Sequence, residues 1–171
     1  MTAICILIVF KCLVQNKSLS LRRKSLSRQA LPPPGIKYNQ RKVELNLTTI
    51  YFIRHAEPDL RIKDEVHRPL TKSGTRQAER LVESFAGLQI DTVYSSPAVR
   101  AYATVKPLAH SRNLTVRTLE GLHERRIGTW VDDFETFSKR QWSDFGYKLE
   151  DGESLGEAQS RNLAALRHIL H

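Results

Sequence analysis

The chain has 171 residues, of which 40% are apolar and 26% charged, a composition typical of one soluble globular domain. The formal net charge is +9, but residues 1–48 hold nine Lys or Arg and one acid, whereas residues 49–171 hold 18 Lys or Arg and 17 acids. A nucleic-acid-binding domain carries its basic patch on the folded face that binds, so this distribution argues against a nucleic-acid partner.

The first 48 residues differ from the remainder in composition. Their longest apolar run, Ala3 to Phe10, is too short to cross a membrane, and Pro32-Pro33-Pro34 favours an extended linker. Both cysteines, Cys5 and Cys12, lie here, so residues 49–171 cannot form a disulfide, a cysteine-based zinc site or a thiol nucleophile. We expect residues 1–48 to be a disordered or artefactual extension of a cytoplasmic protein. An organelle transit peptide or a poorly formed secretory signal is the alternative.

Alternating strand and helix patterns begin at Thr49. Thr49 to Ile53 is β-branched and aromatic, which predicts a buried strand. Thr71 can cap a helix that ends at Gly87, and its apolar stripe consists of Ala78, Leu81, Val82 and Phe85. Asp91 to Tyr94 predicts a second strand.

The next pair of elements repeats this order. Ser96 as N-cap and Pro97 at the first helical position predict a helix that runs to about Ser111. The side chains that it buries are predicted to be Ala101, Tyr102, Val105 and Leu108. Leu114 to Thr118 predicts a third strand.

Two helices follow. Asp132 or Asp133 can open a helix through Trp142, and Ser154-x-x-Glu157 is a capping box before a helix that reaches the last residue. Strands that alternate with helices predict βαβ units, and hence an α/β fold with a parallel sheet covered by helices on both faces. Reactive side chains collect at the carboxyl ends of the strands of such a sheet.

Charged side chains follow each of the three predicted strands. Arg54 and His55 end the first strand, Arg100 lies in the first turn of the helix after the second, and Glu124 follows the third. An imidazole can attack phosphorus, guanidinium groups and a helix N-terminus can hold phosphate oxygens, and a carboxylic acid can protonate a leaving oxygen. Each residue alone is typical of a surface position. Because all of them follow successive strands at the same edge of the sheet, a catalytic or phosphate-binding role is favoured over a purely structural one.

Five motifs in order resemble the histidine phosphatase superfamily, in its phosphoglycerate-mutase-like branch, from about Thr49 to the C-terminus. The matching stretches are Ile50 to Glu57, Arg68-Pro69-Leu70-Thr71 with Gly74 and Gln77-Ala78, Tyr94 to Pro97 with Arg100-Ala101, Glu124 with Gly128 and Trp130, and Asp151 to Leu155. The resemblance implies a three-layer α/β sandwich with a mostly parallel sheet and a histidine phosphatase domain over residues 49–171.

The resemblance also implies a reaction, the hydrolysis of phosphomonoesters by an acid/alkaline-type histidine phosphatase. His55 would be the nucleophile and form a phosphohistidine, Arg54 and Arg100 would bind the phosphate, and Glu124 would be the proton donor and acceptor. No metal or other cofactor would be needed. The partner would be a small phosphorylated substrate, with no nucleic acid and no membrane.

Two departures from the family pattern matter. Ala56 replaces the common glycine after the nucleophile, and we expect it to be tolerated. The family's second catalytic histidine, in a Ser-His-Gly type turn after a later strand, has no counterpart, because His67, His110, His123, His168 and His171 all lack that context. We therefore expect a domain that lacks its last strands at the C-terminus, with poor solubility and weak or no activity.

Three questions stay open at the level of sequence. An inactive phosphate-binding remnant is one alternative function, and a phosphoglycerate mutase is another, less favoured because the stretch between Trp130 and Asp151 is short. Substrate choice would depend on the loops Leu60 to His67 and Val131 to Lys148. The sequence predicts neither the substrate nor the oligomeric state.

Overall fold

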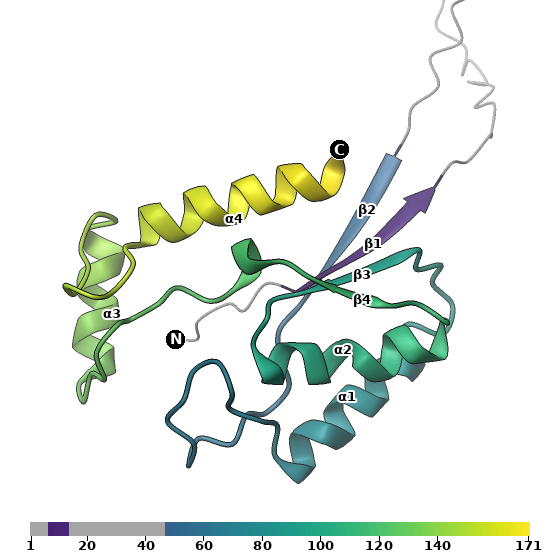
Figure 1. Ribbon diagram of the computed structural model, residues 1–171, viewed down its shortest axis with the longest axis horizontal. Helices are drawn as coiled ribbons and strands as arrows, with labels where there is room; N and C mark the ends of the chain where they lie inside the picture. The colour runs from purple at the N-terminus through teal and green to yellow at the C-terminus, as the bar shows by residue number, and fades with distance from the viewer. Residues whose placement is uncertain (1–6, 14–46) are drawn as a thin grey trace, which may run out of the picture.

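The computed structural model describes residues 7–13 and 47–171. A four-stranded sheet in the order β2-β1-β3-β4 lies at its centre (Figure 1). The strands are β1 (Leu7–Leu13), β2 (Leu47–Ile53), β3 (Thr92–Ser95) and β4 (Val116–Thr118). β1 is antiparallel to both β2 and β3, and β3 is parallel to β4. The three predicted strands β2, β3 and β4 therefore run in one direction, as expected, and β1 runs against them.

β1 is the main difference from the expected architecture. Leu7–Leu13 belongs to the segment 1–48, which we expected to be disordered, yet it pairs with β2 from Leu7 opposite Ile53 to Leu13 opposite Leu47. The apolar, β-branched sequence of this run suits a central strand, and it satisfies backbone groups that β2 and β3 would otherwise leave unpaired. Apart from Leu47 and Thr48 in β2, the other residues of that segment lie outside the described part.

The helices begin at the predicted caps with one exception. The elements are α1 (Lys72–Ser84), α2 (Val99–Ser111), the 3₁₀ turn η1 (Glu120–Leu122), α3 (Phe134–Ser143) and α4 (Leu155–Leu170). Thr71 caps α1, Asp133 caps α3, and Ser154 forms the predicted capping box with Glu157 at α4. α1 ends at Ser84, before the predicted Gly87.

The exception is α2, for which the prediction of a Ser96 cap is wrong. Its N-cap is Ala98, whose side chain cannot accept a hydrogen bond, and Ser96 is buried. The first free N–H group of the helix, that of Val99, donates instead to the carbonyl of Val66 at 2.9 Å. A loop from elsewhere in the chain thus replaces the local side-chain cap.

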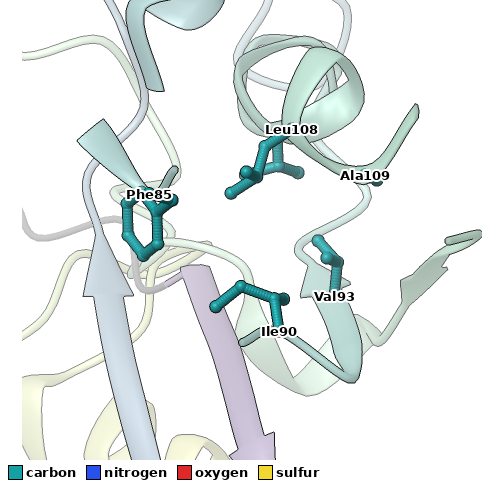
Figure 2. Close-up of a cluster of buried hydrophobic side chains, with 6 residues drawn as sticks. Phe85, Ile90, Val93, Leu108 and Ala109 are labelled. Atoms are coloured by element: carbon teal, nitrogen blue, oxygen red, sulfur yellow. The ribbon is translucent and has the colours of Figure 1, made fainter. Parts of the chain in front are cut away.

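Helices cover both faces of the sheet, which confirms the three-layer architecture. α1 and α2 lie on one face and α4 on the other (Figure 1). The first face holds a buried cluster drawn in Figure 2, which consists of Phe85, Ile90, Val93, Val105, Leu108 and Ala109. Tyr51 of β2 packs against this cluster, whereas its neighbour Ile50 packs on the other face against Leu122 and Ala165. This alternation is that of a strand buried on both sides.

None of the helices in the described part of the chain is both long and apolar enough to cross a membrane.

We predict that Leu108→Ala destabilises the fold by about 2–5 kcal/mol, because Leu108 is fully buried in the α1–α2 layer and its loss leaves a cavity. Urea unfolding followed by circular dichroism measures the change. Leu163→Ala, on the exposed side of α4, is the matched control and should change stability by no more than about 0.5 kcal/mol. Equal effects of the two variants would contradict the packing described.

Candidate active site

Three of the four predicted site residues meet at the carboxyl ends of the strands. His55 follows β2, Arg100 lies at the start of α2 after β3, and Glu124 follows η1, which comes after β4. The Glu124 carboxylate lies between the other two: its Oε2 is 2.6 Å from Nη2 of Arg100 and its Oε1 is 3.5 Å from Nε2 of His55. The expectation that successive strand ends bring these residues together is met in the structure.

The ring of His55 is held so that one nitrogen faces Glu124. Nδ1 lies 2.7 Å from the carbonyl oxygen of Ala56. A carbonyl only accepts hydrogen bonds, so Nδ1 must carry a proton, and in the neutral ring Nε2 then keeps its lone pair. The side chain is 7% exposed. His55 thus presents a potential nucleophilic nitrogen to the space that it shares with Glu124.

A buried threonine ties the His55 turn to α2. The N–H of Ala56 donates to Oγ1 of Thr104 at 2.9 Å, and the Thr104 hydroxyl donates to the carbonyl of Arg100 at 2.7 Å. Ala56 itself is buried and does not have a positive φ, so its methyl group causes no backbone strain. Alanine after His55 is therefore accommodated, as expected.

Arg100 is a buried cation with fixed partners. The residue is 3% exposed; Nη1 donates to the carbonyl of Glu65, and Nη2 donates to Glu124. It lies in the first turn of α2, where the helix dipole favours an anion and disfavours a cation. The guanidinium is held there by these two oxygen partners, and it gives the edge of the sheet a preorganised positive charge.

Opposing effects act on the pKa of Glu124. Burial raises it, but the hydrogen bond that Nε2 of His55 donates when it carries a proton, and the charge and hydrogen bond of Arg100, together outweigh burial, so the pKa lies below its usual range. Glu124 pairs with this distant arginine rather than forming the surface ion pair with Arg125 or Arg126 that its sequence neighbours would suggest. Its ionisation is thus coupled to the two residues that would contact a phosphate.

The structure does not bring Arg54 into this cluster. Arg54 is exposed, and within residues 7–13 and 47–171 it forms no hydrogen bond or ion pair. Its position next to His55 is given by the sequence alone, so its role as a phosphate ligand stays a prediction.

Several residues that support the site were missed at the level of sequence. Glu65 contributes only its backbone carbonyl, for which side-chain chemistry gives no signal. Thr104 could have been found, because it lies one helical turn after Arg100 on the buried side of α2. Arg161 and Glu153 also contact the segment that carries Glu124, from α4 and the turn before it.

The described residues contain no group of three or more His, Cys, Asp or Glu side chains placed to hold a metal ion.

The sequence model of the histidine phosphatase superfamily (branch 1) matches residues 50–171. The chain belongs to this superfamily. Phosphoserine phosphatase 1 of Hydrogenobacter thermophilus is 30% identical over 136 residues, which make up 72% of this chain and 64% of that protein. A 2,3-bisphosphoglycerate-dependent phosphoglycerate mutase of Thermoplasma acidophilum is 38% identical over 82 residues, or 45% of this chain and 41% of that protein.

The solved structures show the same fold. A mycobacterial glucosyl-3-phosphoglycerate phosphatase, solved with inorganic phosphate, aligns with a TM-score of 0.60 at 23% identity. The alignment covers 68% of this chain and 59% of that one. The phosphoglycerate-mutase-like fold expected from the superfamily is thereby confirmed. The chain spans less than two thirds of the length of these relatives.

We predict that Thr104→Val destabilises the protein by about 1–3 kcal/mol, because it leaves the buried N–H of Ala56 without its acceptor while keeping the side-chain shape. Thermal and urea unfolding measure the change. Thr75→Val on the exposed side of α1 is the matched control, since it removes the same hydroxyl from a helix without burying an unpaired group. A Thr104 variant as stable as the Thr75 variant would show that Thr104 does not hold the His55 turn.

Proposed function

We propose that this protein hydrolyses small phosphomonoesters through a phosphohistidine on His55. The observation that carries the proposal is that His55 and Arg100 both lie within hydrogen-bond or ion-pair distance of the Glu124 carboxylate. A candidate nucleophile, a buried cation and a candidate acid thus meet at one place. Membership in the histidine phosphatase superfamily supports it. In this proposal residues 49–171 are the catalytic domain, a range that the match over residues 50–171 supports.

The first step would transfer the phosphoryl group to the protein. Nε2 of His55 attacks phosphorus with its lone pair, and the bond between phosphorus and the ester oxygen breaks. The departing oxygen takes a proton from the Glu124 carboxyl group and leaves as the alcohol. Arg100, with Arg54 beside His55, holds the phosphoryl oxygens and offsets their charge in the transition state.

The second step would return His55 to its starting state. The Glu124 carboxylate takes a proton from a water molecule, whose oxygen attacks phosphorus as the bond to His55 breaks. Inorganic phosphate is released, and Glu124 is again protonated. The same carboxyl group serves as acid and then as base, so no metal ion is required to activate water in this scheme.

Substrate binding would itself favour the protonated form of Glu124, which the first step needs. In the structure, Arg100 and His55 both hold the pKa of Glu124 down. A phosphate group between them would accept the Arg100 hydrogen bond and place negative charge beside the carboxylate, and both changes raise the pKa of Glu124. The acid form is then favoured when there is a leaving group to protonate.

We predict that His55→Ala lowers the hydrolysis of p-nitrophenyl phosphate at least about 10³-fold, since it removes the nucleophile. Release of p-nitrophenol measures turnover, and rapid quenching with a ³²P-labelled substrate detects the acid-labile phosphohistidine. His168→Ala, an exposed histidine on α4, is the control and should retain both signals. Undiminished hydrolysis by the His55 variant would reject the proposal.

We predict that Glu124→Gln lowers kcat/KM for alkyl phosphates at least about 10²-fold more than kcat/KM for p-nitrophenyl phosphate, because a poor leaving group needs the proton in the first step and a good one does not. The wild-type kcat/KM for alkyl phosphates should rise as the pH falls through the acidic range and level off near the pKa of Glu124, which would mark the enzyme as the acid type. The Glu124 variant should lose this rise. If the pH profile is the same in both proteins, Glu124 is not the acid.

A second candidate is phosphate binding without turnover. The hydrogen bonds and ion pairs of His55 and Arg100 among the described residues involve no second histidine. Calorimetry with vanadate separates the two functions: binding that is lost in Arg100→Ala, together with no phosphohistidine in the wild type, would favour the binding protein.

A further inference from the structure

Behind the site, a second arginine–carboxylate pair joins α4 to the turn that precedes it. Arg161 donates from Nε to Oε1 of Glu153 at 2.8 Å and from Nη2 to Oε2 at 2.6 Å. The side chains are 20% and 9% exposed. Two parallel hydrogen bonds of this kind fix the plane of the guanidinium, which a lysine could not do.

The remaining donors of Arg161 bind the backbone of the segment that carries Glu124. Nη1 donates to the carbonyls of Gly121 and His123, both at 2.9 Å, and Nη2 lies 3.5 Å from the carbonyl of Glu124 itself. The guanidinium therefore contacts the backbone at, or within three residues of, the proposed acid.

Glu153 holds the same segment from its other end. The N–H of Glu153 donates to the carbonyl of Arg126 at 2.7 Å, and the N–H of Arg126 lies 3.3 Å from Oε2 of the Glu153 side chain. The hydrogen bonds from Arg161 lower the pKa of Glu153, so the carboxylate stays charged and the pair stays intact at neutral pH. Residues 121–126 are thus fastened at both ends by one ion pair.

Close packing of α4 keeps Arg161 in register. Ala165 lies one helical turn after Arg161 and packs closely against η1. A Cβ added to Gly121 would lie only 2.7 Å from the Cβ of Ala165. Ala158, Arg161 and Ala165 share one face of the helix, and the two alanines are buried. Since α4 and η1 cannot approach each other more closely at this contact, the position of Arg161 along the backbone of residues 121–124 is fixed.

We propose that Arg161, together with Glu153, is a positioning residue for the phosphoryl-transfer reaction: the pair holds the backbone of residues 121–126 so that the Glu124 carboxylate reaches both His55 and Arg100. This inference rests on the proposed function. Arg161 forms no hydrogen bond to His55 or Arg100 among the described residues, so it acts through the placement of Glu124.

A positioning role makes a selective prediction. If Glu124 shifts by about 1 Å, steps that need its proton slow by as much as about 10²-fold, whereas attack by His55 on an ester with a good leaving group is little affected. General loss of folded protein would instead reduce turnover of all substrates by the same factor.

The test compares Arg161→Lys, which keeps the charge but loses the planar fork, with Arg167→Lys, the same change at an exposed position on α4. For each full-length protein, kcat and KM are measured with p-nitrophenyl phosphate and with an alkyl phosphate. We expect kcat/KM for p-nitrophenyl phosphate, divided by kcat/KM for the alkyl phosphate, to rise at least about tenfold in the Arg161 variant and to stay unchanged in the Arg167 variant. This quotient is used because kcat also contains dephosphorylation, which needs Glu124 with either substrate. Equal loss with both substrates, or an unchanged ratio, would overturn the proposal.

A second readout needs no turnover. In protein labelled with ¹³C at glutamate side chains, the Glu124 resonance is assigned from its loss in Glu124→Gln and is titrated with pH. We expect its pKa to lie below the usual range in the wild type and to rise in Arg161→Lys, because the carboxylate moves away from His55 and Arg100. An unchanged titration overturns the positioning role, whereas a wild type that titrates as expected but forms no phosphohistidine contradicts the proposed function instead.

Discussion

The burial of the Arg100 guanidinium is the constraint on which the arrangement of the site depends. A cation removed from water must find oxygen partners, or its desolvation opposes folding by several kcal/mol. Arg100 takes one partner from the loop before α1, the carbonyl of Glu65, and another from beyond β4, the Glu124 carboxylate. Three segments that are distant in sequence are therefore joined at one charge, and the arrangement of the candidate site results from the same contacts.

Glu124 is held from two sides by arginines with different tasks. Arg100 and His55 bind its carboxylate, whereas Arg161 and Glu153 bind the backbone around it. Both Arg100 and Arg161 are paired with a carboxylate, so the charges of these two arginines are balanced before any substrate arrives. In the proposed reaction, an arriving phosphate would exchange one anionic partner of Arg100 for another, which would require little rearrangement of the protein and would alter mainly the proton affinity of Glu124.

Local patterns predicted the elements well, and non-local contacts account for what was missed. Thr71, Asp133 and Ser154 act as caps because each completes a motif within four residues. Ser96 failed because the carbonyl of Val66, remote in sequence, had already satisfied the first N–H group of α2. The place of β1 in the sheet likewise depends on strands that come much later in the chain: its apolar, β-branched sequence suits a strand but does not say which strands it pairs with.

The same distinction applies to the site. His55, Arg100 and Glu124 could be grouped from sequence because strand ends of one direction share an edge of the sheet, which is a rule about topology. That rule does not say where a side chain points, and Arg54, which follows the same strand as His55, stays exposed. Both residues lie beyond Ile53, the last residue of β2, where the regular alternation of the strand no longer determines which way a side chain faces. The supporting contacts of Arg161 go to backbone carbonyls, which every residue has, and no sequence pattern marks them.

The order of the strands also sets the width of the site. β1 lies between β2, which leads to His55, and β3, which leads to Arg100. Two strand spacings place these strands about 10 Å apart, too far for direct contact between short side chains. Glu124, which enters from beyond β4, therefore has to bridge them, at 3.5 Å from one and 2.6 Å from the other. In the proposed reaction, a phosphate group would contact His55 and Arg100 across this same gap. The strand between β2 and β3, though it contributes none of the four predicted site residues, thereby sets the distance between His55 and Arg100.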